Sequence, residues 1–337
     1  MINQKNINNS FIFKLILLYL TIFILYKGEP NNINQKKKLI FNNKTNRDNT
    51  YENDIIKKNK VCLCTLGKEE NKYIREYVEH YFKYGVDKIF LYDNNDINGE
   101  KFEDVISDYI RNDFVEIFNW RGKIKALYSI MNDCYKKNFL FYDWLIFYEL
   151  DEFIHLLNYS NIKLFLNQEK FNKCDLVQLN LICHSDNNLL YYQNKSLYER
   201  FPKLTPISKL GGRLLEVKSI LRGHIPDIVI NNAHCINFDK KYKNCNGFGH
   251  LYKNKQRFAT EKDYKYFYID HFYSKSTEEF INKLNKGDAM FRSKDFTLHR
   301  INKYFIQSDF TEEKRIMIEK RTGLNLSKFI NYSSIRI

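Results

Sequence analysis

The fold is decided by residues 61–95, VCLCTLGKEENKYIREYVEHYFKYGVDKIFLYDNN. The apolar run Val61–Leu66 predicts a buried β-strand. The next segment, Glu69–Tyr84, carries aromatic and aliphatic residues at helical spacing, and Gly85 marks the C-terminal end of that helix. A second apolar run, Asp87–Tyr92, predicts another strand and is followed by Asp and Asn residues. This strand-helix-strand order predicts two neighbouring parallel strands.

The same alternation continues beyond this stretch. Apolar residues at helical spacing predict helices near residues 102–110 and 124–134, and short apolar runs predict strands at 115–118 and 144–148. We therefore expect an α/β fold with a mostly parallel central sheet and helices on both faces. Ligands of such sheets bind beyond the carboxyl ends of the strands. Polar residues stand at three of those ends, namely Thr65, Asp93 and the pair Glu149 and Asp151.

Glu149 and Asp151 directly follow the fourth predicted strand. In an extended segment, residues two apart point to the same side, so both carboxylates are expected to face one space. Mn²⁺ and Mg²⁺ prefer oxygen ligands, and such an ion stabilises the charge on a departing diphosphate. A solvated acidic turn has the same sequence appearance, so the motif alone leaves both interpretations open.

Several ordered motifs resemble those of glycosyltransferase family 92 and related family 2-like enzymes. They are the opening segment 62–95, WLIFYELDEF (144–153), Lys218–Arg222, and DHFYSKSTEEF (270–280) with Lys283 and Gly287 after it. The resemblance covers about residues 61–290. It implies a GT-A fold, a nucleotide-sugar donor, most simply a UDP-sugar, and a divalent metal, Mn²⁺ or Mg²⁺. The implied reaction transfers the sugar to a hydroxyl of a glycan or glycoconjugate, with inversion.

The resemblance also implies roles for individual residues. Those expected to bind the donor are Thr65, Glu70, Asp93 and Asn94 around the nucleoside, and Lys218, Arg222 and Lys275 around the diphosphate. Those expected to bind the metal are Glu149, Asp151 and His271, with His234 as the alternative histidine. An inverting transfer needs a carboxylate base. Asp186 and Glu216 are the candidates, and a solvated loop carboxylate is the alternative interpretation for each.

Two departures from the family pattern motivate other functions. Glu149 occupies the first acidic position, and residues 183–188 (CHSDNN) replace the loop Phe-Gly-Ser-x-Gly. A catalytically inactive carbohydrate-binding or scaffold protein with the same fold is therefore the second hypothesis. A nucleotidyltransferase is the third, and it is disfavoured because Gly67 stands alone where a glycine-rich phosphate loop would be expected.

The remaining sequence indicates the organisation around this domain. A tail (1–10) precedes an apolar stretch (11–26) that predicts a single-pass membrane anchor. An Asn- and Lys-rich stretch (27–59) predicts a disordered stalk, residues 60–290 the GT-A domain, and 291–337 a helical C-terminal extension packed on it. In a eukaryote this arrangement suggests the lumenal side of the Golgi or endoplasmic reticulum. Lysines 36–38 beyond the anchor leave the membrane orientation open.

Composition adds two expectations. The net charge of +14 comes mostly from scattered lysines, which favours a solvated basic surface over a nucleic-acid groove. We therefore expect no nucleic-acid partner. Seven cysteines without a CxxC pair argue against a zinc knuckle. Cys235 and Cys245 are near enough in the sequence to form a disulfide in an oxidising compartment.

Overall fold

The computed structural model has a compact unit that spans Ile55–Ile337. Across the whole chain, it describes residues 52–206, 216–234, 242–252, 266–287, 294–309 and 311–326. The predicted anchor at 11–26 and residues 27–51 of the predicted stalk lie outside the described residues, whereas residues 52–58, predicted to be disordered, form a helix. Within the described ranges, no helix has the length and apolar character that a membrane span requires.

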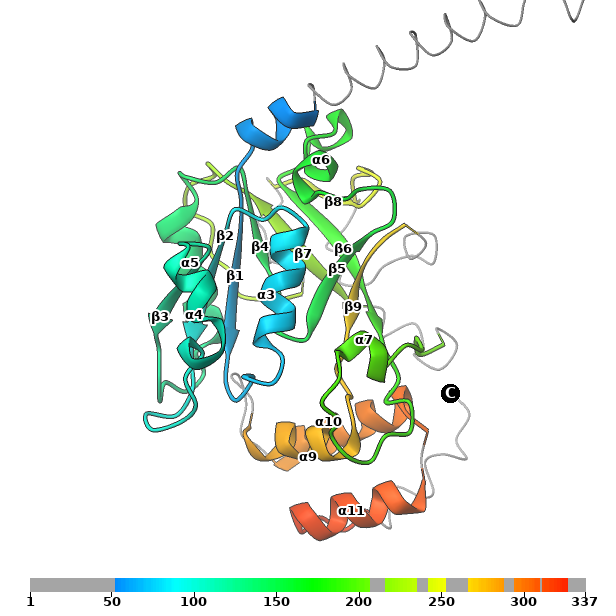
Figure 1. Ribbon diagram of the computed structural model, residues 1–337. Helices are drawn as coiled ribbons and strands as arrows, with labels where there is room; N and C mark the ends of the chain where they lie inside the picture. Colours follow the sequence, from blue (N-terminus) through cyan, green and yellow to red (C-terminus); the bar gives the residue numbers. More distant parts are fainter. Residues whose placement is uncertain are drawn as a thin grey trace, which may run out of the picture. The chain divides into compact units, whose positions relative to one another are not determined.

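The strands and helices predicted up to residue 148 are present (Figure 1). They are β1 (Val61–Gly67), α3 (Ile74–Lys83), β2 (Lys88–Asp93), α4 (Glu103–Arg111), β3 (Val115–Asn119), α5 (Leu127–Asn138) and β4 (Trp144–Phe147). β1 pairs in parallel with both β2 and β4, and β2 pairs in parallel with β3. The sequence pattern therefore predicted both the elements and the direction of this half of the sheet.

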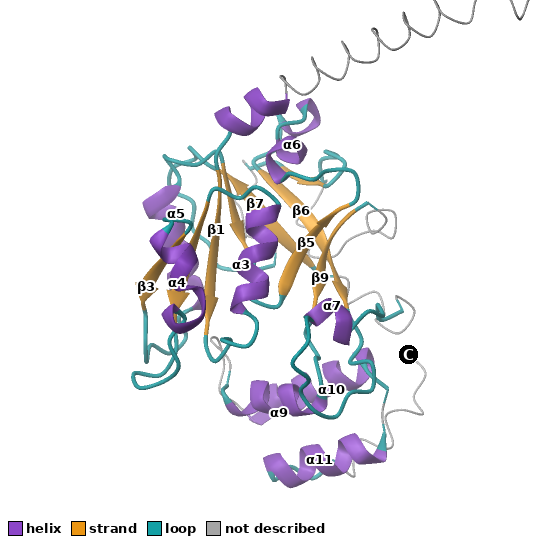
Figure 2. Cartoon of the chain, in the orientation of Figure 1, coloured by secondary structure: helices purple, strands orange, loops and turns teal. Residues whose placement is uncertain are grey.

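The rest of the chain completes the sheet differently. Its elements are β5 (Glu152–Leu156), α6 (Ile162–Leu166), η1 (Glu169–Phe171), β6 (Leu176–Cys183), α7 (Leu197–Arg200), β7 (Val217–Arg222), β8 (Asn244–Asn246), β9 (Phe267–His271), α9 (Thr277–Asn285), α10 (Lys294–Gln307) and α11 (Glu312–Thr322). The strand order is β3-β2-β1-β4-β7-β6-β9-β5, with β8 beside β6 (Figure 2). β7 is antiparallel to both of its neighbours, and β5 is antiparallel to β9.

The sheet is thus mixed. Five of the eight pairings among the described strands are parallel, including β6–β8 and β6–β9 in the second half, so the expectation of a mostly parallel sheet holds apart from the three antiparallel pairings. Parallel neighbours need long crossover connections, usually helices, whereas antiparallel neighbours do not. Between the antiparallel neighbours β6 and β7, the described residues contain only the short helix α7. The expectation of helices on both faces is confirmed. Val61 and Leu63 of β1 pack in the same cluster as α3 and α4, while Cys62 and Cys64 pack in the cluster of α5.

Two disulfides cross-link the domain. Cys64 of β1 is bonded to Cys134 of α5, and Cys174 is bonded to Cys245 of β8. The predicted bond between Cys235 and Cys245 is therefore wrong. β8 runs beside β6, with Cys245 paired to Val177 in the register, and this brings Cys245 to Cys174 despite their separation in the sequence. Cys235 lies outside the described residues.

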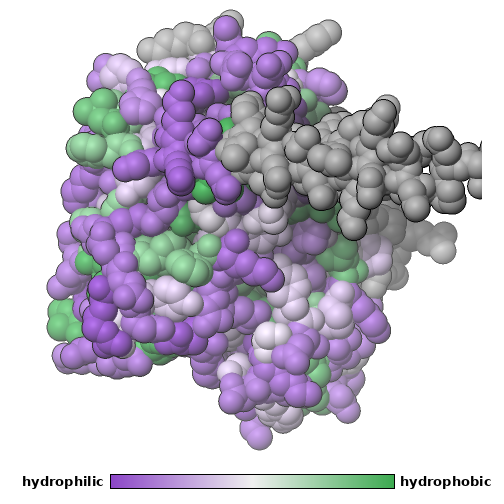
Figure 3. All heavy atoms as spheres, turned by 45° about the horizontal axis from the view of Figure 1, so that its top comes forward, coloured by the Kyte–Doolittle hydropathy of each residue, from purple (hydrophilic) through white to green (hydrophobic). Residues whose placement is uncertain are grey.

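The C-terminal helices α9, α10 and α11 share a third core, which includes Phe280, Ile301, Tyr304 and Ile318. They lie beyond the carboxyl end of β1 (Figure 1). The face seen in Figure 3 is mostly hydrophilic, and its apolar side chains form small separate patches. The large apolar faces of this domain are therefore buried in three clusters rather than presented on that surface.

Candidate active site

A cavity of about 490 Å³ lies at the carboxyl ends of β1, β2 and β4. One wall is formed by residues at or just beyond those strand ends, including Gly67, Asn94 and Glu149–Glu152. α9 and α10 supply basic residues to the cavity, namely Lys283, Lys286, Arg300 and Lys303. Gly67 has no room for a side chain, because a Cβ there would lie 2.5 Å from Cδ1 of Leu150.

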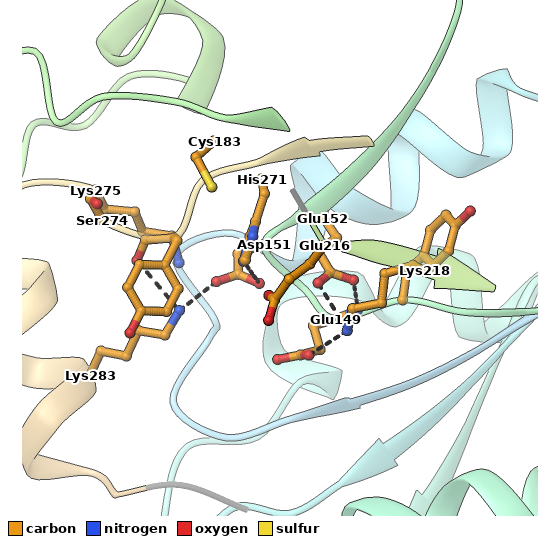
Figure 4. Close-up of polar contacts among 12 residues, drawn as sticks. Glu149, Asp151, Glu152, Cys183, Glu216, Lys218, His271, Ser274, Lys275 and Lys283 are labelled. Atoms are coloured by element: carbon orange, nitrogen blue, oxygen red, sulfur yellow. Dashed lines mark hydrogen bonds and ion pairs between the residues drawn. The ribbon is translucent and has the colours of Figure 1, made fainter. Parts of the chain in front are cut away.

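The acidic motif forms a turn, not the extended segment that we expected. The backbone N–H of Glu152 donates to the carbonyl of Glu149 at 3.0 Å, and β5 begins at Glu152. A carboxylate oxygen of Glu152 accepts from the backbone N–H of Glu149 at 3.0 Å. The turn changes which side chains come together. Asp151 groups with Glu152 and His271, whereas Glu149 points to a different partner (Figure 4).

Asp151, Glu152 and His271 are buried, and one candidate ligand atom from each lies within 4.8 Å of the others. Strand pairing sets this geometry. Glu152 and His271 are directly opposite each other in the β5–β9 register, and the N–H of Phe272 donates to the carbonyl of Asp151 at 2.9 Å. Nε2 of His271 lies 3.7 Å from Oδ1 of Asp151. Two carboxylates and an imidazole at this separation form a donor set that suits a divalent cation.

The electrostatics of two of these residues, His271 and Asp151, also suit a cation. Burial lowers the pKa of His271 to about 3, so its ring is neutral and able to coordinate a metal. Nδ1 of His271 is buried without a hydrogen-bond partner among the described residues. Burial raises the pKa of Glu152 to about 8. Burial also tends to raise the pKa of Asp151, but Lys283 and His271 outweigh it and hold that pKa well below its usual value.

Two lysines compensate the acidic turn. Nζ of Lys218 lies 2.6 Å from Oε1 of Glu149 and 3.0 Å from Oε1 of Glu152. Nζ of Lys283 lies 2.7 Å from Oδ2 of Asp151. Lys218 lowers the pKa of Glu149 to about 2. Glu149 therefore serves as the partner of a buried ammonium and lies outside the three-residue group.

The sequence model of glycosyltransferase family 92 matches residues 57–306, which is most of the chain. The chain belongs to glycosyltransferase family 92. Family 92 proteins of Ricinus communis and of Oryza sativa subsp. japonica are each 25% identical to it over 132 residues. That stretch is 38% of this chain but only 23% and 22% of the two relatives, so the match spans less than a quarter of their length. The resemblance stated from the motifs is confirmed.

Two crystal structures of S. aureus TarS are among the solved structures to which this chain is weakly similar. The crystal structure of S. aureus TarS 1-349 in complex with UDP has a TM-score of 0.35 and 12% identity, covering 82% of this chain and 76% of that one. TarS 1-349 in complex with UDP-GlcNAc has a TM-score of 0.33 and 11% identity, covering 78% and 80%.

Two of the residues expected to bind the donor, Glu70 and Asn94, line the cavity at the carboxyl ends of β1, β2 and β4. The amide of Asn94 donates to the carbonyls of Trp120 at 2.9 Å and Lys123 at 2.8 Å, so it fixes the loop after β3. Glu70 forms ion pairs with Lys286 and, at 3.4 Å, with Lys275. Burial tends to raise the pKa of Glu70, but the two lysines lower it overall.

Three other expected donor residues lie outside this cavity. Thr65 and Asp93 are buried, and neither lines the cavity. Asp93 pairs with Arg121 at 2.6 Å and accepts from the amide of Asn95 at 2.8 Å, which shapes the loop that carries Asn94. Lys275 lines an adjoining cavity of about 300 Å³, where its ammonium lies 3.8 Å from the centre of the Tyr73 ring.

Arg222 lies at the opposite end of the sheet from the acidic turn. It pairs in the register with Trp144, the first residue of β4. Its guanidinium donates to the carbonyls of Cys174 at 2.8 Å and Phe171 at 2.6 Å, and it covers the Trp144 ring at 4.2 Å. The expectation that Arg222 contacts the diphosphate is therefore not met, because β7 runs antiparallel to β4 and carries Arg222 away from the cavity.

The two candidate bases are in different environments. Asp186 does not line the cavity; it is buried against Nζ of Lys314 at 2.6 Å and the hydroxyl of Tyr304 at 2.9 Å. Its predicted role as base is thus replaced by a structural one, anchoring α10 and α11. Glu216 lines the cavity, 3.4 Å from Nζ of Lys303 and 3.7 Å from Nε2 of His234.

Sequence reasoning missed several residues that line this cavity. Glu152 was quoted within the acidic motif but was not assigned to the metal group. Glu152 could have been found from its position next to Asp151 if the motif had been predicted to form a turn instead of an extended segment. Lys283 followed the closing motif at helical spacing from Glu279, and this would have placed it on the same face of α9. Lys303 of α10 had no motif around it.

Proposed function

We propose that this family 92 chain transfers a sugar from a nucleotide-sugar donor, most simply a UDP-sugar, to a hydroxyl of a glycan or glycoconjugate, with a divalent metal. One observation supports this most directly. Asp151, Glu152 and His271 lie together in a cavity at the carboxyl ends of parallel strands, and lysines line the same cavity. That combination suits a metal-bound diphosphate, which needs a cation site and further positive charge around it.

Asp151, Glu152 and His271 are the residues proposed to hold Mn²⁺ or Mg²⁺. When bound, such an ion neutralises charge on the departing diphosphate. The neutral imidazole of His271 and the depressed pKa of Asp151 leave both groups in the protonation state that metal binding needs. Lys283, Lys286 and Lys303 line the same cavity and are proposed to add positive charge around the diphosphate.

Glu216 is proposed as the base of an inverting transfer. The acceptor oxygen bonds to the anomeric carbon as the bond to the diphosphate breaks, and the hydroxyl proton moves to the Glu216 carboxylate. Glu216 is favoured over Asp186 because only Glu216 lines the cavity. Replacing it tests the assignment. Glu216→Gln is expected to lower the turnover rate by about 10²-fold or more, with donor affinity within a few-fold of the parent.

The compartment is proposed from the disulfides and the N-terminal sequence. Disulfides persist in oxidising compartments, and two of them cross-link this domain. The apolar stretch at 11–26 is proposed to anchor the chain in a membrane, with the catalytic domain on the lumenal side.

The experiment is a donor screen with the purified full chain. Mn²⁺ and each of a panel of nucleotide-sugars are added, and thermal stabilisation and release of the nucleoside diphosphate are measured. We expect stabilisation by one donor class only with metal, and slow diphosphate release that accelerates with a suitable acceptor. Absence of any nucleotide binding contradicts the proposal. Glycan binding without diphosphate release supports the inactive binding protein.

A further inference from the structure

We propose that Lys283 is an exchangeable counter-ion: it pairs with Asp151 until the donor arrives and then pairs with the donor diphosphate, so that metal and nucleotide bind cooperatively. The inference rests on the proposed function, and it concerns a residue for which the acidic motif implies no role. It explains why a group suited to a cation already holds an ammonium ion at 2.7 Å.

The charge balance of the buried group motivates the proposal. Glu149, Asp151 and Glu152 contribute at most three negative charges, and Lys218 and Lys283 contribute two positive charges. Together with His271, these groups therefore carry at most one net negative charge. A divalent ion would reverse this to an excess positive charge in a mostly buried place, which is unfavourable. The diphosphate of a donor supplies the missing negative charge, so each ligand is expected to favour the other.

The contacts of Lys283 and Lys218 show which ammonium is able to exchange. Lys218 is almost completely buried, contacts two carboxylates and does not line the cavity. Lys283 lines the cavity, and Asp151 is its one ion-pair partner among the described residues. In the view of Figure 4 the two ammonium groups lie on opposite sides of Asp151. Only Lys283 therefore has a neighbouring space into which its charge can move.

The second contact of Lys283 helps to define its movement. Its ammonium lies 4.2 Å from the centre of the Tyr273 ring and donates a long hydrogen bond, 3.4 Å, to the Tyr273 carbonyl; Tyr273 also lines the cavity. An aromatic face stabilises a cation without fixing it in one direction. Asp151 meanwhile offers Oδ1 toward His271, while Oδ2 is occupied by Lys283. A metal bound between Asp151 and His271 would repel the nearby ammonium, and repulsion between close charges is strong in a poorly hydrated site.

The test is calorimetric titration of the full chain with Mn²⁺, alone and with saturating UDP, in the parent and in Lys283→Met and Lys283→Arg. We expect UDP to tighten Mn²⁺ binding to the parent by about tenfold or more, and by linkage Mn²⁺ to tighten UDP equally. Lys283→Met is expected to tighten Mn²⁺ binding without UDP by about tenfold, because the competing ammonium is gone, and to reduce the coupling. Lys283→Arg is expected to keep both properties.

Lys88→Met is the matched control, since Lys88 begins β2 at the end away from the cavity and pairs with Asp113 and Glu116. Circular dichroism checks that each variant is folded. Lys283→Met with unchanged Mn²⁺ affinity and unchanged coupling overturns the inference, and so does Lys283→Arg that behaves as Lys283→Met. A parent chain that binds neither Mn²⁺ nor UDP overturns the proposed function instead, so the two failures are distinguishable.

Discussion

The first half of the domain, β1 to β4, and the second half, β5 to α11, contribute differently to the same cavity. The first half is a parallel α/β unit, and the strand ends and the turn after β4 supply most of the cavity carboxylates, including Glu70 and Asp151. The second half combines parallel and antiparallel strands with the C-terminal helices, and it supplies His271, Lys283 and Lys303. The proposed metal group needs both halves, because Asp151 and His271 come from opposite sides of this division.

This difference indicates how the proposed activity is divided. The parallel first half holds the acidic turn after β4 in place. The second half adds the imidazole of His271 and the ammonium groups of Lys218 and Lys283, which balance the negative charge of that turn. We expect substitutions at Asp151, Glu152 and His271, which come from both halves, to act mainly on metal binding. Substitutions elsewhere in the second half are expected to act on charge balance or on stability.

The largest effect is expected at the acidic edge. Asp151→Asn removes a charged metal ligand and should lower transfer activity about 10³-fold, as loss of a major electrostatic contact in an active site does. Steady-state diphosphate release measures it. Asp108→Asn, which removes an exposed carboxylate of α4 paired with Arg75, is the control and should keep full activity. An Asp151→Asn chain with more than a tenth of the parent rate would contradict the assignment.

Removing each disulfide in turn allows the stability of the two halves to be compared, because each half contains one disulfide. Cys64–Cys134 and Cys174–Cys245 close loops of nearly equal length, with separations of 70 and 71 residues. The loop-entropy model therefore predicts that replacing either pair by serine lowers the free energy of unfolding by about 4 kcal/mol. Urea denaturation measures each loss. A clear difference between the pairs would show that one half retains structure after unfolding, and no loss for either would refute the model here.

A somewhat smaller loss is expected at Asp186. Asp186→Asn leaves the buried ammonium of Lys314 without its carboxylate, which should cost about 3 kcal/mol of folding free energy. The change is expected to act on stability, with the transfer rate of the folded fraction near that of the parent. Denaturation and rate measurements on the same sample separate the two. Lost activity with parental stability would restore Asp186 as the base.

The smallest effect is expected at Arg222. Arg222→Lys loses the paired contacts to the carbonyls of Cys174 and Phe171 and should reduce stability by about 1 kcal/mol. UDP affinity should stay within about twofold of the parent, because Arg222 lies at the far end of β4. Titration with UDP checks this. A loss of affinity of tenfold or more would return Arg222 to the donor site.

The sequence predicted the first half well because its apolar runs and helical spacing alternate regularly up to residue 148. The closing motif correctly assigned His271 to the site, although it lies far from the acidic motif in the sequence. The prediction for Arg222 failed because the direction of β7 cannot be inferred from its own residues. Asp186 was misassigned because its partner Lys314 belongs to a much later helix. Glu152 was overlooked because the rule for extended segments does not hold in a hydrogen-bonded turn.

The pairing of β5 has a consequence for the order of folding. Among the described strands, β5 pairs only with β9, and Glu152 and His271 are register partners about 120 residues apart in the chain. A nascent chain that has not yet extended past β9 holds its acidic turn without the strand that orients it. Such long-range contacts form late, since a large loop must close first. We therefore expect the chain to bind the metal only after β9 has paired with β5, and not as soon as the acidic motif has been synthesised.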